Sequence, residues 1–208
     1  MDFPAFFANA PTVTLRDPLM PFLGASADGV VTYCYADAVK LAGHSCPTVA
    51  GAWLMVRRGL TQLYGTDTPE RGGIDVFLRD SRDTGTTGVI ASIATLLTGA
   101  APETGFGGIG PHARFRRRGL MQFDTPIPGL MALRRRDTGA AVAVDLDVSG
   151  IAVDARMGPL FGRAIAGTAT PEEEAQFGAL WQQRVEAMLI EHADDPALTP
   201  MAEWRAAA

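Results

Sequence analysis

The sequence predicts an α+β domain with a mixed sheet, followed by C-terminal helices. Three patterns support this prediction: an amphipathic helical repeat at residues 47–64, a nearly all-apolar segment at 88–98, and two strand-like segments around a tight turn at 137–139. The expected order is helix, strand, helix, then about three antiparallel strands, then helices. We expect one domain at residues 1–168 and a C-terminal helical tail at 169–208.

The first half of the chain contains the strongest helix signal. Residues 1–32 are rich in proline and turn formers, and we expect an arm that wraps the surface with little regular structure. A short helix is expected at 35–42. The next helix, at 47–64, begins with Pro47 at the first helical position, where a missing N–H costs nothing. Its apolar stripe consists of Val49, Trp53, Val56, Leu60 and Leu63.

The second half consists mainly of expected strands. Residues 73–79 predict a short strand, and the small side chains of 88–98 with a following glycine favour a buried helix. Residues 112–124 are strand-like but irregular. The next strands are expected at 130–136 and 140–148, joined by the Asp-Thr-Gly turn. An acidic amphipathic helix is expected from Glu172 to His192, after Thr170 as the N-cap.

Composition excludes several classes of protein. The 208 residues are 47% hydrophobic with a net charge of −5, which argues against disorder and against a global attraction to nucleic acid or anionic membranes. No apolar run approaches the ~18 residues of a spanning helix, and the N-terminus lacks a basic leader. Two cysteines, Cys34 and Cys46, cannot form a disulfide framework, so we expect a cytoplasmic protein.

The segment Gly43-His44-Ser45-Cys46-Pro47 is the most informative motif. Cys46 falls at the N-cap of the long helix, where the helix dipole and free N–H groups stabilise a thiolate. His44 lies two residues earlier on extended chain. An imidazole and a thiolate at one helix start suit zinc or a similar metal, and they also suit a cysteine nucleophile with a histidine base. A buried thiol beside a hydrogen-bonded histidine is the structural alternative.

Residues 35–47, which end in this motif, resemble the opening motif of the FmdE-like family of formylmethanofuran dehydrogenase components. Residues 88–110, with Leu-Thr-Gly and a glycine-rich loop, resemble a second element of that family. The resemblance spans residues 33–125. It implies helix–strand–helix followed by antiparallel strands, as in the catalytic domain of glyceraldehyde-3-phosphate dehydrogenase. It also implies a divalent metal near His44 and Cys46, and a homodimer.

The chain departs from the family pattern at several positions. Ala42 replaces the first histidine of the motif, and Thr48 replaces the glycine after its proline. Val89 and Ala100 stand near the places of further cysteines. No cysteine follows Cys46, so the zinc-finger tail of longer members is missing. The resemblance therefore carries over only two metal ligands.

A metal site needs at least a third ligand, and His112 is our candidate. It follows the glycine-rich loop and would give a His₂Cys set with an open position, the pattern of a catalytic zinc. Asp83 and Cys34 are alternatives. His192, on the acidic tail helix, is expected to be solvated.

Two further motifs have plainer explanations. Residues 105–110 satisfy G-x-G-x-x-G, but a dinucleotide site needs a strand before the motif and a helix after it. Here a helix and a loop precede the motif, and Pro111-His112 follows. Asp-Thr-Gly occurs at 83–85 and 137–139, yet charged residues precede both triplets, unlike an aspartic protease.

Arginine is unevenly distributed. Residues 112–137 carry seven arginines, including the runs 116–118 and 134–136, whereas 172–195 carry seven acidic residues. The two segments could pair within a chain or across a dimer. If the two runs lie on paired strands, they could instead hold a phosphate or carboxylate ligand.

We therefore expect a metal-binding protein of the FmdE type, with zinc at His44, Cys46 and His112, and a homodimer that binds neither nucleic acid nor membrane. Whether it is an enzyme, and whether it takes a small-molecule ligand, is left open. One alternative is a metal-free accessory module whose arginine-rich face binds an anionic partner. The other is a thiol enzyme with Cys46 as nucleophile and His44 as base.

Overall fold

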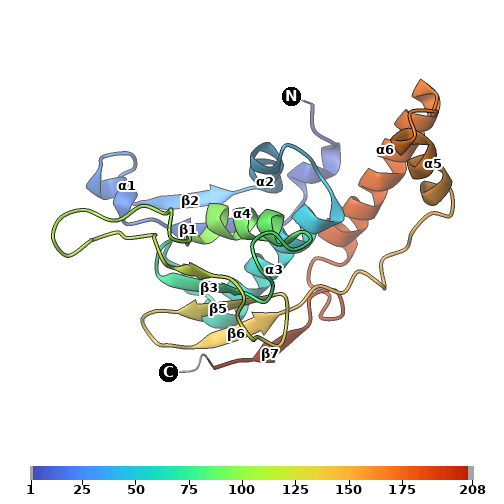
Figure 1. The fold of residues 1–208 in the computed structure, drawn as a ribbon. Helices are drawn as coiled ribbons and strands as arrows, with labels where there is room; N and C mark the ends of the chain where they lie inside the picture. Colours follow the sequence, from blue (N-terminus) through green and yellow to red (C-terminus); the bar gives the residue numbers. More distant parts are fainter. Residues whose placement is uncertain (1, 206–208) are drawn as a thin grey trace.

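The computed structural model describes residues 2–205 and has an α+β fold with a mixed five-stranded sheet (Figure 1). The strands lie in the order β4-β3-β5-β6-β7. β3 pairs parallel with β4 and antiparallel with β5, and the remaining pairs are antiparallel. The strands are β3 (Ile74–Leu78), β4 (Met121–Gln122), β5 (Met131–Arg135), β6 (Ala141–Val144) and β7 (Met201–Glu203). The α+β class and the mixed sheet predicted from the sequence are confirmed.

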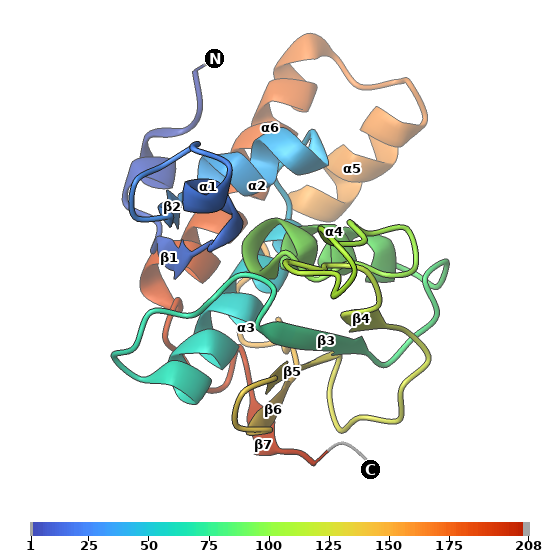
Figure 2. The ribbon, with the colours of Figure 1, turned by 90° about the vertical axis from the view of Figure 1, so that its left-hand side faces the viewer.

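Helices α3 (Pro47–Tyr64) and α4 (Thr87–Thr98) cover one face of the sheet (Figure 2). Gly59 of α3 faces Leu133 of β5 so closely that a Cβ atom there would collide with the leucine side chain. The opposite face carries a smaller apolar cluster around Phe77, which Trp204 partly covers. Polar side chains therefore remain on that second face.

The long helix forms where its apolar repeat predicts it. Pro47 occupies the first turn, and Cys46 is the N-cap, with its Sγ accepting a hydrogen bond from the Val49 N–H at 3.5 Å. Trp53 is fully buried, and its Nε1 donates to the Pro11 carbonyl at 2.9 Å. The helix thus ties the N-terminal segment to the core.

The N-terminal arm is more regular than predicted. It contains the 3-10 helix η1 (Ala5–Ala8), β1 (Val13–Arg16), α1 (Leu19–Phe22) and β2 (Val30–Tyr33), and β1 pairs antiparallel with β2. The expectation of an arm with little regular structure is wrong because Val13 and Leu15 alternate with exposed residues and pack into the core.

The tail contains more than helices. Helix α2 (Tyr35–Ala42) comes long before the tail in the chain and packs near the start of α3. Towards the C-terminus, α5 (Met157–Ile165) and α6 (Pro171–Glu186) form a hairpin at the other end of the molecule from α1 (Figure 1). After a π-helical turn at Ala187–Glu191, the chain returns to the sheet as β7. The predicted tail at 169–208 is thus partly integrated into the sheet. Residues 1 and 206–208 lie outside the described residues.

The irregular strand expected at residues 112–124 is confined to β4. Residues 112–118 instead form a loop, joined to the rest by an isolated bridge between Ala101 and Arg118. The two arginine runs therefore do not lie on paired strands, because only 134–135 belong to one. Among the described helices none is long and apolar enough to span a membrane.

Candidate anion-binding pocket

Asp17 directly follows β1 and is a buried carboxylate, 4% exposed, shared by two arginines. Arg71 Nη1 donates to one oxygen at 2.7 Å, and Arg117 Nη2 donates to the other at 2.6 Å. Buried charge is costly unless it is paired and hydrogen-bonded, so these contacts hold both guanidinium groups in place. Burial lowers the pKa of Arg117, and the nearby Asp17 opposes that shift. One carboxylate for two guanidinium groups leaves net positive charge.

Arg71 also closes the C-terminal end of α4. Its Nε donates to the Leu97 carbonyl at 3.0 Å, and its Nη2 donates to the Leu96 carbonyl at 3.0 Å. The next N–H, of Gly72, donates to the Thr98 carbonyl at 2.8 Å. A cation is favoured at a helix C-terminus, where carbonyl groups lack partners within the helix. The segment before β3 is thereby fixed against α4.

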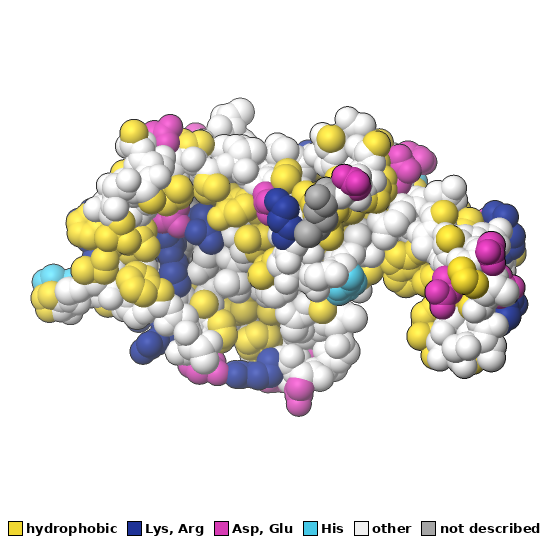
Figure 3. Space-filling model, turned by 90° about the horizontal axis from the view of Figure 1, so that it is seen from above, with side chains coloured by type: hydrophobic (Ala, Val, Ile, Leu, Met, Phe, Trp, Pro, Cys, Tyr) yellow, Lys and Arg dark blue, Asp and Glu magenta, His cyan; other side chains and the backbone are white. Residues whose placement is uncertain are grey.

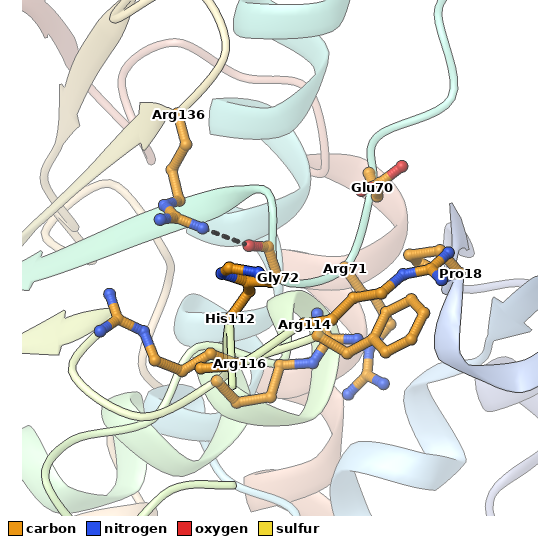
Figure 4. A pocket seen from close by; sticks show the side chains of 11 residues that line it. Pro18, Glu70, Arg71, Gly72, His112, Arg114, Arg116 and Arg136 are labelled. Atoms are coloured by element: carbon orange, nitrogen blue, oxygen red, sulfur yellow. Dashed lines mark hydrogen bonds between the residues drawn. The ribbon is translucent and has the colours of Figure 1, made fainter. Parts of the chain in front are cut away.

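A pocket of about 530 Å³ opens beside this cluster (Figure 4). Its charged lining consists mostly of cations: Arg71, Arg114, Arg116, Arg117 and Arg136. Glu70 is the only acidic residue of the described chain in this lining, and it is already paired with Arg16 at 2.7 Å. His112 also lines this pocket and stands between Arg136 and Arg114 in the close view (Figure 4). In Figure 3 basic side chains lie in a hollow near the end of the molecule that carries α1.

Arg114 and Arg116 are the cations available to a ligand. In the described part of the chain, neither has a carboxylate within ion-pair distance. The Arg114 guanidinium lies over the Phe115 ring at 4.4 Å and over the Phe22 ring at 5.1 Å, which orients it without neutralising it. The ion pair of Arg136 with Asp75 is long, at 3.5 Å.

The loop that carries these side chains is strained. Ala113 has φ +48° and Phe115 has φ +65°, in the left-handed region that residues with a Cβ rarely adopt. Paired backbone hydrogen bonds between Ile109 and Arg114, of 2.8 and 3.0 Å, hold the loop against the glycine-rich segment. Gly108 is needed there because a Cβ would collide with the Ala113 backbone. Strain of this kind is concentrated at functional sites.

The glycine-rich segment therefore packs against a loop and does not begin a helix. Residues after Gly110 form turns and lead to β4. This is not the strand–loop–helix arrangement that a dinucleotide-binding fingerprint needs. The sequence-based rejection of a nucleotide site on this motif agrees with that geometry.

His44 and Cys46 lie at the junction of α2 and α3, away from this pocket. His44 is exposed, with Nδ1 3.0 Å from the Ala42 carbonyl, and Cys46 is half-buried. Between them, the Ser45 carbonyl accepts hydrogen bonds from Trp181 and Gln182 of α6, each at 3.1 Å. Helix α6 thus fixes the backbone of the motif.

The structure does not assemble the predicted metal site within one chain. Among residues 2–205 there is no group of three or more His, Cys, Asp or Glu side chains that could hold a metal ion. His112 instead lies in the arginine-lined pocket, on the loop of residues 112–118. Whether a second copy supplies a ligand to His44 and Cys46 stays a prediction.

The other candidate ligands have local partners. Cys34 is the N-cap of α2, and its Sγ donates to Asp37 at 3.3 Å. Asp83 is exposed and accepts a hydrogen bond from Ser81 at 2.6 Å. His192 is less solvated than predicted, because it is half-buried with Nδ1 2.9 Å from an Asp195 oxygen.

The acidic segment 172–195 does not neutralise the arginines of 112–137 within the described chain. Its ion pairs are Glu173 with Arg163, Asp194 with Arg57, and Asp195 with His192. Helix α6 lies at the other end of the molecule from α1 (Figure 1), and Pro18, the N-cap of α1, lines the pocket. Pairing of the two segments within one chain was therefore a wrong alternative.

No known family model matches the chain, and no curated protein matches it. A solved structure does. The chain is similar to a tungsten formylmethanofuran dehydrogenase FmdE-like protein from Syntrophus aciditrophicus, with 14% sequence identity and a TM-score of 0.44, over 84% of this chain and 74% of that chain.

Sequence reasoning found the arginine runs but missed the residues that organise them. Asp17, Arg71 and Arg117 come from three distant segments, and nothing in their local sequence marks them as partners. The one usable signal was Asp17, which follows the alternating apolar residues Val13 and Leu15 and directly precedes Pro18. A buried acid of that kind requires a cation somewhere in the fold.

Proposed function

We propose that this protein binds a small-molecule anion, carrying a phosphate or a carboxylate group, in the arginine-lined pocket. The observation that supports this most strongly is that Arg114 and Arg116 line the pocket without a described carboxylate partner. Unneutralised guanidinium groups give a pocket a positive potential, which favours binding of an anion. Arginine is also suited to bidentate hydrogen bonding with planar carboxylates and with phosphates.

Contacts within the chain hold most of the pocket's side chains in place. Asp17 fixes Arg71 and Arg117, stacking on Phe115 orients Arg114, and the Gly72 carbonyl accepts a hydrogen bond from Arg136 at 3.3 Å (Figure 4). Side chains that are held before binding lose less conformational entropy on binding. His112 adds a ring nitrogen that can donate to the same anion.

Titration calorimetry of the full chain at low ionic strength tests this function. Orthophosphate and succinate are the probes, since they separate a phosphate ligand from a carboxylate ligand. Arg114→Gln and Arg116→Gln should each weaken binding of the preferred probe about tenfold or more, the typical effect of losing a charged hydrogen bond.

Arg118→Gln is the matched control for those variants. Arg118 belongs to the same loop, carries the same charge and is exposed like Arg114 and Arg116, but it bonds to the Gly105 carbonyl and does not line the pocket. Equal losses in all three variants, or no binding of either anion to the wild type, would contradict the proposal.

Zinc binding at His44 and Cys46 is a second candidate function. The observation in its favour is that the Cys46 Sγ accepts a hydrogen bond from the Val49 N–H at the start of α3, two residues after His44. Two protein ligands are fewer than zinc sites use, so further ligands would have to come from a second copy in a homodimer. Zinc would act there as a Lewis acid or a structural link.

A further inference from the structure

A second cavity adjoins the arginine-lined pocket. It has a volume of about 590 Å³ and lies near the start of β3 and the end of β5. Arg116 and Arg136 line both cavities, so their side chains form a common wall. In the close view, the guanidinium groups of these two residues lie on the same side of His112 (Figure 4). The two cavities are therefore adjacent parts of one basic cleft.

The second cavity is also positively charged. Its own cations are Arg134, Arg135 and Arg205, and Asp75 is the one acidic residue of the described chain in its lining. Arg134 binds Asp75 through Nε at 3.1 Å and Nη2 at 2.8 Å, and Arg135 pairs with Asp137. In the described residues, no carboxylate is within ion-pair distance of Arg205.

Positive charge on both sides of a shared wall suits a ligand with more than one anionic group. Arg116 and Arg136 can each present donors to both cavities, because a guanidinium group has five N–H donors in a planar fork. A single phosphate in the first pocket would leave Arg205 and the second cavity without an anion. The lining of the second cavity is mainly polar, which disfavours a large apolar group there.

We propose, on the basis of the proposed function, that the natural ligand is an elongated polyanion of the oligophosphate type. One anionic group is held in the first pocket beside Arg114. The chain of the ligand then passes the wall formed by Arg116 and Arg136, and a second anionic group lies beside Arg205 in the second cavity. The charge of the ligand is thus distributed along the whole cleft.

Titration calorimetry with orthophosphate, pyrophosphate and tripolyphosphate at constant ionic strength tests the second position. Arg205→Gln changes the second cavity alone, and Arg114→Gln changes the first alone. We expect Arg205→Gln to weaken tripolyphosphate binding about fivefold, as for an exposed ion pair, and to leave orthophosphate binding unchanged. Arg205→Glu should weaken tripolyphosphate binding further, and Arg114→Gln should weaken binding of all three anions.

The more highly charged probes also bind better through general attraction, and Arg118→Gln measures that contribution. If Arg205→Gln and Arg205→Glu reduce tripolyphosphate binding no more than Arg118→Gln does, the second position is refuted and the anion site at Arg114 stands. If the wild type binds none of the three anions, the oligophosphate ligand is refuted, and succinate binding then decides the proposed function. If the wild type binds them but Arg114→Gln has no effect on any of them, the anion site at Arg114 fails as well.

Discussion

The Asp17 carboxylate accepts a hydrogen bond of 2.6 Å from the Arg117 guanidinium, although the two residues are 100 positions apart in the chain. Arg71 donates to the other oxygen of the same carboxylate. This contact connects the end of β1 to the loop that carries Arg114 and Arg116. The geometry of the pocket therefore depends on a buried ion cluster.

Asp17→Asn should destabilise the protein by about 3 kcal/mol, because removing one partner of a buried ion pair leaves uncompensated buried charge. The amide also presents an N–H donor to guanidinium groups that need acceptors. The measurement is the free energy of unfolding from urea titration. Asp194→Asn is the control, since Asp194 pairs with Arg57 at the surface and its side chain is 78% exposed. We expect a loss below about 1 kcal/mol there, and equal losses in both variants would refute the role of Asp17.

Gly72→Ala should cost more stability than Gly139→Ala. Both glycines have positive φ, +83° and +76°, so a Cβ strains both backbones by about 1 kcal/mol. At Gly72 the new methyl group would also collide with the Arg117 guanidinium, whereas nothing lies within 4 Å at Gly139. Overpacking at Gly72 adds about 1–3 kcal/mol. Unfolding free energies within error of each other would show that Arg117 moves aside freely.

Tyr35→Phe should remove part of the loss of stability at alkaline pH. Burial raises the pKa of Tyr35 above its usual value, against the opposing hydrogen bond with Ser45. Above about pH 10 the unfolded chain releases the Tyr35 hydroxyl proton, whereas the folded chain retains it. The free energy of unfolding therefore falls as the pH rises beyond that value. Urea titrations at pH 8 to 11 give the slope of the unfolding free energy against pH for the wild type and for Tyr35→Phe. The wild type should show the steeper decline, and identical slopes would contradict the effect.

Zinc bound at the start of α3 should depend on His44 and Cys46. Cys46→Ser replaces a thiolate with a neutral hydroxyl, and His44→Ala removes the neighbouring imidazole, so each should lower zinc affinity about tenfold or more. Elemental analysis after dialysis against trace zinc, combined with light scattering, measures metal content and the expected homodimer together. Cys34→Ser is the control, because the Cys34 thiol bonds to Asp37.

Zinc-free wild-type protein, or the same zinc content in Cys46→Ser, would rule the site out. His112→Ala lowers zinc affinity only if His112 from a second copy is a ligand. Unchanged affinity in this variant, with the expected losses in the other two, would leave His112 to the anion pocket.

Local patterns predicted local structure well. The spacing of Val49, Trp53 and Val56 placed the long helix at residues 47–64, where α3 lies, and a proline and a glycine marked its ends. The apolar segment at 88–98 is α4, which begins one residue earlier. These elements have their determinants within a few neighbouring residues.

Contacts between distant segments could not be predicted in this way. The alternation of Val13 and Leu15 was present but short, and proline-rich surroundings concealed β1. The pocket arises only when the loop at 112–118 meets Asp17 and Arg136, because the fold brings these segments together. A list of arginines in the sequence does not show which of them lack a carboxylate partner.

The position of a bound anion tests the central claim most directly. Selenate is a tetrahedral anion with a strong anomalous signal, and a crystal of the full chain grown with millimolar selenate would reveal its binding site. We predict an anomalous peak in the arginine-lined pocket, beside the Arg114 guanidinium, that is absent from crystals of Arg114→Gln. A peak that persists in that variant, or selenate bound only outside the arginine-lined pocket, would contradict the account.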